Sequence, residues 1–500
     1  MADIPSSSHP PAAPRGRLRQ ALNIHAGEGV AAVCGFAFFF FLFTGYFMLR
    51  PIRETLGIAA GVDKLQWLFT ATFVVMLAAV PCFGWLARRV PRTNFVSWIY
   101  AFFAMTLVVF AAWLHQQPDN LWAARAFYVW LSVFNLFVVS VAWSLMADVF
   151  HTVQAKRLFA FISAGASTGG LTGPVLGGAL AGILGAPGLI LLSAVFLGLT
   201  LPMKSWLMRW RESAGAGAVE TSTATGTAGA EAVETPKTAG TVSAEAVETP
   251  KAAGTVSADA VETTKTAGTV GSETAAMRGA AKPAPFDPAS PARPIGGGIL
   301  AGATRTFTSP LLLGIAAFVI LLATASTFLY MEQARLVADA FASSAQRIRV
   351  FSALDFAVQV LSLLTQLFLT GRLAQRLGVT FLLTAVPLAI CVGFLVLAAA
   401  PVFAVLAVVM VLRRVGEYAL VRPGREMVFT TVDAEAKYKA KNFIDTVVYR
   451  AGDAASAWVK TGVDALGHGA ALVALVGALC AAIWAACGYL LGRRTDSRRV

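Results

Sequence analysis

Charged residues are scarce in this chain, which has 13% Asp, Glu, Lys and Arg against 57% hydrophobic residues over 500 positions. Soluble domains carry about 25% charged residues. The composition therefore excludes a water-soluble globular protein and indicates that lipid surrounds most of the chain. The formal net charge of +13 is spread over short clusters that never form one basic face, so we expect no nucleic-acid partner.

Cysteine and histidine are also few, with five residues of each. The cysteines lie inside apolar runs, without a CxxC pair and without histidine at metal-binding spacing, which argues against a disulfide framework or a metal site. The sequence shows no phosphate-binding loop, hydrolytic triad or other catalytic constellation. We therefore expect neither an enzyme nor a cofactor.

Apolar runs long enough to cross a bilayer recur along the chain. A spanning helix needs about 20 apolar residues, because only a helix or a closed barrel satisfies its backbone hydrogen bonds in lipid. The pattern predicts an all-α membrane protein with about twelve transmembrane helices in two groups of six. The expected spans are residues 29–49, 65–87, 95–114, 122–149, 158–184, 187–208, 310–331, 350–370, 379–399, 401–424, 442–466 and 470–492.

Positive residues gather in one set of the expected loops. They precede the first span and follow the second, fourth, eighth, tenth and twelfth: Arg15, Arg17, Arg19, Arg88, Arg89, Arg92, Lys156, Arg157, Arg372, Arg376, Lys437, Lys439, Lys441, Arg493, Arg494, Arg498 and Arg499. The opposite loops carry little Lys or Arg apart from Arg335, Arg347 and Arg349. The positive-inside rule then places both termini in the cytoplasm. We expect a multi-pass protein of a bacterial inner membrane, with no cleavable signal peptide.

A low-complexity segment of Ala, Thr, Gly, Glu and Pro separates the two groups of spans. A 14-residue repeat occurs in it three times, beginning at Ala230, Ala244 and Ala258. Such a segment buries too little apolar surface to offset its ordering entropy, so we expect a disordered cytoplasmic linker, either a passive spacer or a docking segment. The expected organisation is a tail (1–28), a first half (29–211), the linker (212–305), a second half (306–492) and a basic tail (493–500).

The two halves carry matching motifs at corresponding places. Residues 149–153 (VFHTV) after the fourth span match residues 428–432 (VFTTV) after the tenth, and residues 84–90 after the second span resemble residues 371–377 after the eighth. The matches indicate a duplicated six-helix unit, as in the major-facilitator architecture. The substrate site is then expected between the halves, near the bilayer midplane.

Charges inside spans are costly in lipid, so each is a functional candidate. At the end of the first span, Arg50 and Arg53 could face the central cavity as anion ligands if Pro51 breaks the helix, or could extend to the membrane interface. Glu332, closing the seventh span, and Asp355, in the eighth, could take up protons or pair with these arginines.

The tenth and eleventh spans hold the densest charge. Arg413, Arg414 and Glu417 share one face of the tenth helix, and their surplus positive charge favours an anionic substrate. The tenth span also carries Arg422 and Arg425. Charges of both signs in the eleventh span favour an internal ion-pair network at least as much as ligand contact: Asp445, Arg450, Asp453 and Lys460.

The fifth span has a stripe of glycines at four-residue spacing: Gly165, Gly169, Gly173 and Gly177. Small residues at this spacing let two helices approach closely. The stripe predicts a helix-packing face, which serves either tight packing alone or a helix that rocks against its neighbour.

Three motifs resemble those of the bacterial and plastid ATP/ADP translocases, a family of nucleotide antiporters. The first, residues 49–56 (LRPIRETL), resembles Leu-Arg-x-x-Lys-Asp-x-Leu at the end of that family's first helix. The second combines Trp143 and Asp148 with Ala-Lys-Arg at 155–157. The third is the most specific, a Lys-rich loop running into Lys-x-x-Ile-Asp-x-x-x-x-Arg-x-Gly: Lys437, Lys439, Lys441, Ile444, Asp445, Arg450 and Gly452.

The resemblance implies a major-facilitator-like exchanger of ATP and ADP, with Arg53 at a functional lysine position and Glu332 as an acidic residue of the seventh helix. The sequence departs from the pattern in two places. Residues 126–147 contain no Asp or Glu where the family has one, and Arg53 replaces Lys, which keeps the charge but changes the geometry. These departures favour an anion-exchanging relative over ATP/ADP exchange itself.

The sequence thus predicts a secondary antiporter of nucleotides or related phosphorylated anions. The expected substrate-binding residues are Arg50, Arg53, Glu332, Arg413, Arg414, Glu417, Asp445 and Arg450. One alternative is a proton-coupled exporter of drugs or metabolites that uses Glu332, Asp355 or Glu417 as its proton site. Another is a membrane sensor or scaffold with a transporter fold, which deletion of residues 212–300 would disable.

Overall fold

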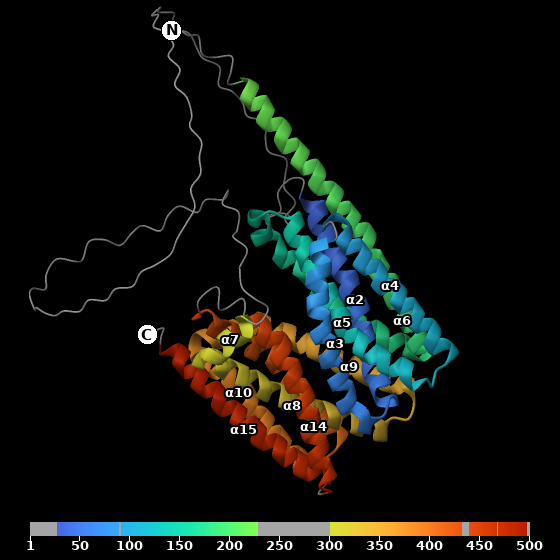
Figure 1. The fold of residues 1–500 in the computed structure, drawn as a ribbon, viewed down its shortest axis with the longest axis vertical. Coiled ribbons are helices and arrows are strands. Elements are labelled where there is room, and N and C mark those ends of the chain that lie inside the picture. The colour runs from blue at the N-terminus through green and yellow to red at the C-terminus, as the bar shows by residue number, and fades with distance from the viewer. Residues whose placement is uncertain (1–27, 90–91, 229–300, 433–439, 468, 498–500) are drawn as a thin grey trace, which may run out of the picture. The chain divides into compact units, whose positions relative to one another are not determined.

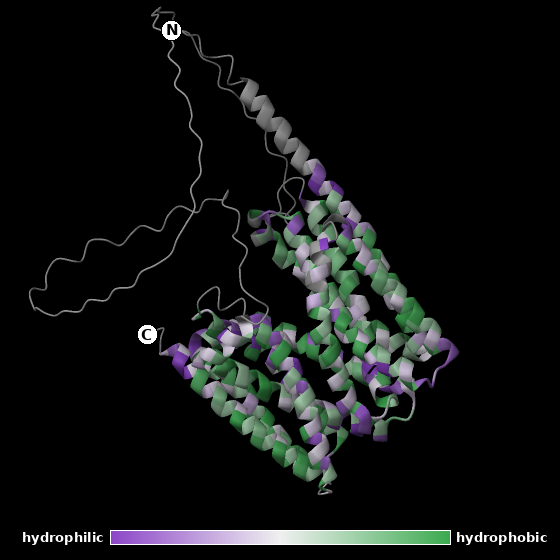
Figure 2. Ribbon diagram, in the orientation of Figure 1, coloured by the Kyte–Doolittle hydropathy of each residue, from purple (hydrophilic) through white to green (hydrophobic). Residues whose placement is uncertain are grey.

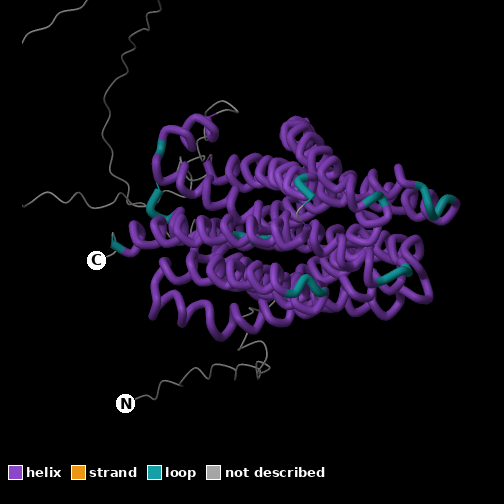
Figure 3. Tube along the Cα trace, turned by 90° about the horizontal axis from the view of Figure 1, so that it is seen from below, coloured by secondary structure: helices purple, strands orange, loops and turns teal. Residues whose placement is uncertain are grey.

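The described part of the chain consists of helices joined by short loops. A computed structural model describes residues 28–89, 92–228, 301–432, 440–467 and 469–497, and no strand occurs within these ranges (Figure 3). The elements are α2 (Gly29–Ala59), η1 (Val62–Lys64), α3 (Leu65–Arg89), α4 (Arg92–Gln116), α5 (Leu121–Val149), α6 (Thr152–Ala228), α7 (Ala301–Thr308), α8 (Pro310–Ala340), α9 (Ser344–Thr365), η2 (Gln366–Thr370), α10 (Gly371–Ala399), α11 (Phe403–Gly416), η3 (Glu417–Val421), α12 (Arg422–Phe429), η4 (Ile444–Val448), α14 (Tyr449–Ala465) and α15 (Gly469–Asp496). The expected all-α fold is confirmed.

Twelve helical spans can be followed in the described residues. Eight segments are long and apolar enough to cross a bilayer. Two of these, 57 and 56 residues long, contain a turn at Gly185 and at Gly378, so each comprises two spans. Two further helical segments, α11 to α12 and η4 to α14, hold the charges of the tenth and eleventh spans. The count agrees with the expected two groups of six, coloured blue to green and yellow to red in Figure 1.

The turn at Gly378, inside α10, lies against the end of α15. Gly378 has φ of +73°, in the left-handed region that glycine adopts without steric cost. The carboxylate of Asp496, at the end of α15, accepts hydrogen bonds from the backbone N–H of Val379 at 3.1 Å and of Thr380 at 3.0 Å. These are donors that a helix start leaves unpaired. Asp496 therefore caps the second part of α10 and ties α15 to it.

Each half has an apolar core, and the first core crosses the boundary between the halves. In the first half, α2 and α5 bury Phe38, Phe127 and Phe134, while the second half buries residues such as Phe318 and Trp484. The first core also includes residues of the second half, on α8, α9 and α14: Met331, Ala334, Val337, Ile348, Phe351 and Ala457. Green, hydrophobic positions run along the helices in Figure 2, as expected where lipid is the solvent.

The glycine stripe of α6 lies against the backbone of α2, within the first half. A Cβ atom added at Gly165 or Gly169 would come within 2.2 or 2.5 Å of the carbonyl oxygens of Phe36 or Phe40. Gly173 is similarly close to α2, whereas a Cβ atom at Gly177 would make only ordinary contacts. The closest approach of the two helices therefore depends on the first three glycines.

Two helices extend beyond the expected spans. Pro51 does not end α2, which continues to Ala59, so the helix break considered at Pro51 does not occur. Proline is tolerated inside a membrane helix when surrounding groups replace the hydrogen bond that it removes. Likewise α8 continues to Ala340, which places Glu332 inside the helix and not at its end.

The expected linker falls mostly outside the described residues, which omit 229–300. The helix α6 runs past position 212 to Ala228, and α7 begins at Ala301. Residues 437 and 439 of the Lys-rich loop also lie outside the described part. The domain boundaries stay predictions.

Candidate functional site

A cavity of about 520 Å³ opens between the two halves. The first half contributes Arg50 from α2, Met76 from α3, and Ser132, Asn135 and Leu136 from α5. The second half contributes a larger and more charged set: Leu322, Arg413, Arg414, Glu417, Tyr418, Val421, Arg422, Arg425, Glu426, Lys441, Asp445, Thr446, Tyr449 and Arg450. The volume lies within the range of about 300–1,000 Å³ that is usual for small-molecule sites.

Arg413 is held in place by two partners on one side of its guanidinium group. Its Nη1 donates to Ser326 Oγ at 2.6 Å and to Glu417 Oε2 at 3.0 Å, the latter one helical turn along the chain. Only 8% of Arg413 is exposed, and its Nε–H group has no hydrogen-bond partner among the described residues. A buried N–H group without an acceptor is costly, and because the Nε atom is buried, it is not itself open to the cavity.

Arg414 and Arg50 share one carboxylate, that of Asp355 on α9. Arg414 Nη1 lies 2.6 Å from Asp355 Oδ1, whereas Arg50 Nε lies 3.9 Å from Oδ2. Arg414 also has a buried nitrogen, Nη2, without a partner in the described part of the chain. The cluster joins α2 of the first half to α9 and α11 of the second.

The remaining cations of the cavity differ in their pairing. Three are paired, with N–O distances of 2.9, 2.6 and 3.4 Å: Arg425–Asp445, Lys441–Glu426 and Arg450–Asp453. Asp453 also accepts from Thr327 Oγ1 at 3.1 Å. Arg422 forms no ion pair with any described residue, and its guanidinium carbon lies 5.1 Å from the centre of the Tyr418 ring.

The charges of the cavity do not balance. Seven cationic and three acidic side chains line it. Asp355 and Asp453 pair with lining arginines from behind, so the cations exceed the carboxylates by two. Arginine stays protonated in proteins, and planar guanidinium groups bind carboxylate and phosphate in a bidentate manner. The arrangement is suited to an anion, above all one with several oxygens.

Most of the residues predicted from the sequence meet in this cavity: Arg50, Arg413, Arg414, Glu417, Asp445 and Arg450. Arg53 does not line it. Its guanidinium group packs over the ring of Tyr128, 4.0 Å from the ring centre, and its Nη1 lies 3.2 Å from Glu54 Oε1. Glu332 is also elsewhere, hydrogen-bonded to Arg335 one turn along α8. Neither residue lines the central cavity in this conformation.

Sequence reasoning left several cavity residues out of the predicted site: Arg422, Arg425, Glu426, Lys441, Tyr418 and Asn135. A signal was present for the arginines, because positions 414, 418, 422 and 425 follow the helical spacing of one face. No local signal pointed to Asn135, which is one of several polar residues in a mostly apolar helix.

Two π-helical turns shape the wall of the cavity. The turn η3 carries Glu417 and Tyr418, and η4 carries Asp445 and Thr446. A third such turn, η2, is hydrogen-bonded to η3 through its side chains. Gln366 Nε2 donates to the carbonyl oxygen of Tyr418 at 3.2 Å, and Thr370 Oγ1 donates to that of Ala419 at 2.8 Å. Such turns are frequent at functional sites because they re-aim side chains.

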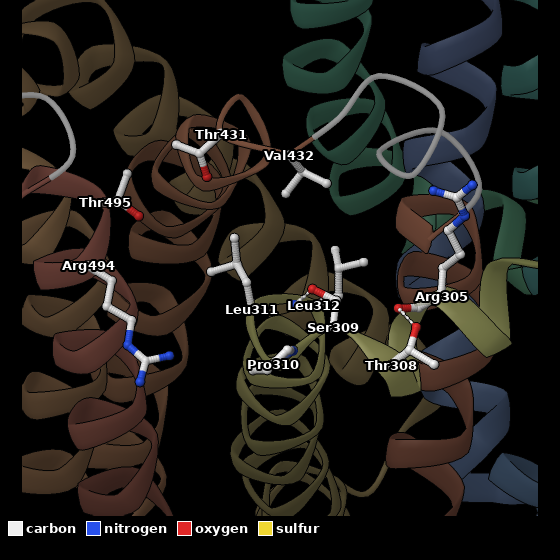
Figure 4. A pocket seen from close by; sticks show the side chains of 10 residues that line it. All are labelled: Arg305, Thr308, Ser309, Pro310, Leu311, Leu312, Thr431, Val432, Arg494 and Thr495. Atoms are coloured by element: carbon white, nitrogen blue, oxygen red, sulfur yellow. Dashed lines mark hydrogen bonds between the residues drawn. The ribbon is translucent and has the colours of Figure 1, made fainter. Parts of the chain in front are cut away.

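A second cavity, of about 500 Å³, lies within the second half at the start of α8. Figure 4 shows Arg305 and Arg494 on opposite sides of it, with Leu311, Leu312 and Val432 between them. None of the predicted site residues lines it. Within the described residues, no group of three or more His, Cys, Asp or Glu side chains has the arrangement of a metal site.

Comparisons with known proteins agree with the fold. The sequence model of the Major Facilitator Superfamily matches residues 30–423. A bacterial homologue of the human lysosomal transporter Spinster, in an inward-facing and unoccupied conformation, has a similar structure at 12% identity and a TM-score of 0.55, covering 94% of this chain and 98% of that one. The nucleoside transporter NupG is similar at 10% identity and a TM-score of 0.51, covering 93% and 99%. No curated protein sequence matches the chain.

Proposed function

The chain belongs to the Major Facilitator Superfamily and is a multi-pass membrane transporter, and from this premise we propose that it exchanges nucleotides or related phosphorylated anions by antiport. The observation that carries this proposal is the surplus of buried and cavity-lining cations over carboxylates between the halves. Charges inside a membrane protein are retained where they meet a partner, and an anionic substrate supplies one here. The resemblance to ATP/ADP translocases in the motifs around Arg50 and Arg450 supports the choice of a nucleotide.

The cavity has groups for both ends of a nucleotide. Arg413 and Arg414 bring their guanidinium groups to the cavity wall, where they can bind phosphate oxygens, and Arg50 and Arg450 add positive charge from α2 and α14. Glu417 and Asp445 keep the guanidinium groups of Arg413 and Arg425 oriented. The rings of Tyr418 and Tyr449 offer apolar surface for the remainder of the substrate.

Transport requires the two halves to reorient around the bound anion. Arg50 belongs to the first half and the other arginines to the second, so a phosphate held between them contacts both halves at once. In this superfamily's architecture, the halves rock about such a central site to expose it to each side alternately. We place the transporter in a bacterial inner membrane with both termini cytoplasmic, on the strength of the positive-inside pattern.

Counter-exchange in proteoliposomes tests this proposal. Purified full-length protein is reconstituted into vesicles loaded with ATP, and uptake of labelled ADP is compared with uptake into empty vesicles. Uptake that requires internal nucleotide is the expected result. Failure to exchange any nucleotide or phosphate ester contradicts the substrate proposal. Uptake or efflux driven by a pH gradient, without substrate on the other side, would support the proton-coupled exporter instead.

A further inference from the structure

Asp355 is a buried carboxylate that the proposed exchange does not use. It lies on α9 with 5% of its surface exposed, and it does not itself line the central cavity. Both of its oxygens face arginines that do: Oδ1 faces Arg414 at 2.6 Å, and Oδ2 faces Arg50 at 3.9 Å. Asp355 is therefore placed behind the anion site, where it can act on a bound anion only through these arginines.

The two contacts of Asp355 are unequal. At 2.6 Å, Arg414 forms a short charge-assisted pair with Asp355. Arg50, at 3.9 Å, lies at the limit of ion pairing and keeps 20% of its side chain exposed. One negative charge thus offsets two positive charges, and the pair of arginines presents a net charge of about +1 to the cavity. Without the carboxylate the same pair would present about +2.

We propose that Asp355 is a specificity-determining residue that sets the charge of the anion accepted between Arg50 and Arg414. This inference rests on the proposed function, because it concerns the same cavity. Neutralising Asp355 should favour anions of higher negative charge. The resident carboxylate repels each negative charge on the ligand, so its loss strengthens the binding of a highly charged anion more than that of a weakly charged one. A merely structural carboxylate would instead affect all anions alike.

The test uses anions that share one chemistry and differ in charge. The purified full-length protein is titrated in detergent with inorganic phosphate, pyrophosphate and tripolyphosphate, and the apparent Kd of each is taken from the stabilisation against heat that it produces. For Asp355→Asn we expect the ratio of the phosphate Kd to the tripolyphosphate Kd to rise about tenfold over that of the unaltered protein. Asp355→Glu keeps the charge and should keep the original ratio.

Two further variants make the outcome decisive. Asp339→Asn removes the same charge from an exposed position outside the cavity, and it should leave the ratio unchanged. If Asp355→Asn does not fold, the double variant Asp355→Asn with Arg414→Gln restores the charge balance, and it should show the original ratio with weaker binding of all three anions. An unchanged ratio in a folded Asp355→Asn protein, an altered ratio in the double variant, or no stabilisation of the unaltered protein by any of the three anions overturns the inference.

The same titration separates this inference from the proposed function. A raised ratio of the phosphate Kd to the tripolyphosphate Kd in Asp355→Asn, combined with no nucleotide exchange in proteoliposomes, would reject nucleotides as the substrate while the role of Asp355 stands. Nucleotide exchange combined with an unchanged ratio would reject the role of Asp355 while the proposed function stands.

Discussion

Arg422 is the cavity arginine whose replacement should weaken substrate binding with the least effect on the stability of the fold. It is exposed to the cavity and forms no ion pair within the described residues, so its replacement leaves no carboxylate uncompensated. Arg414 differs because it is 8% exposed and holds Asp355. Removing one member of a buried pair leaves the other charge unpaired, at a cost of about 3–5 kcal/mol.

For Arg422→Gln we therefore expect the KM for the exchanged anion to rise about tenfold, with little change in thermal stability, because one charge-assisted contact is lost and no ion pair is broken. Initial rates of exchange at varied substrate concentration give the KM. The matched control is Arg89→Gln, which removes the same charge from an exposed residue near Trp85, outside the cavity, and should leave KM unchanged. Equal KM values for the two variants would show that Arg422 does not bind substrate.

At the scale of single elements, the close contact of α6 with α2 depends on the absence of side chains. In Gly169→Ala, the added methyl group would lie 2.5 Å from the carbonyl oxygen of Phe40 and 2.9 Å from the backbone nitrogen of Thr44. Both neighbours are backbone atoms, so the helices must separate. Overpacking of this kind costs about 1–3 kcal/mol.

We expect Gly169→Ala to melt at a lower temperature than the unaltered protein in a detergent thermal-stability assay. The control lies in the second span of α6, after the turn at Gly185: in Gly198→Ala the added methyl group meets nothing within 4 Å. Both changes raise helix propensity equally, so their difference reports the contact with α2 alone. Similar melting temperatures for the two variants would mean that α2 and α6 are not packed as described.

At the scale of the whole molecule, α3 and α14 join the two halves beside the predicted outer ends of the helices. The rings of Trp67 and Trp458 meet edge to face with centres 4.9 Å apart, and Trp458 Nε1 donates to Thr70 Oγ1 at 3.0 Å. Exchange by rocking halves requires this contact to open once in each cycle.

A reducible cross-link across this contact should therefore stop exchange. The pair Trp67→Cys and Trp458→Cys is introduced into a protein whose five native cysteines are replaced by serine, and a short bifunctional thiol reagent joins them. We expect exchange to fall to the level of empty vesicles and to return after reduction. The single variant Trp458→Cys, treated identically, should keep its activity. Undiminished exchange by the cross-linked protein would exclude rocking about this contact.

The sequence alone determined much of the architecture of this protein. Length and apolarity predicted its spans, since each helix must satisfy its own backbone hydrogen bonds in lipid and so carries its own signal. The duplicated motifs after the second and fourth spans of each half indicated two six-helix units. The cost of charge in lipid singled out Arg50, Arg413 and Arg450 as candidates.

Only the tertiary structure decided which of these charges meet. Ion pairing depends on the rotation and register of packed helices, which are set by contacts between residues far apart in the chain, such as Asp355 with Arg50 and Arg414. The same packing turns Arg53 towards Tyr128 although it lies one helical turn from Arg50, and it brings Arg422 and Lys441 into the cavity. Hydrophobicity is a local property of the sequence, whereas the balance of charge in a cavity belongs to the assembled helices.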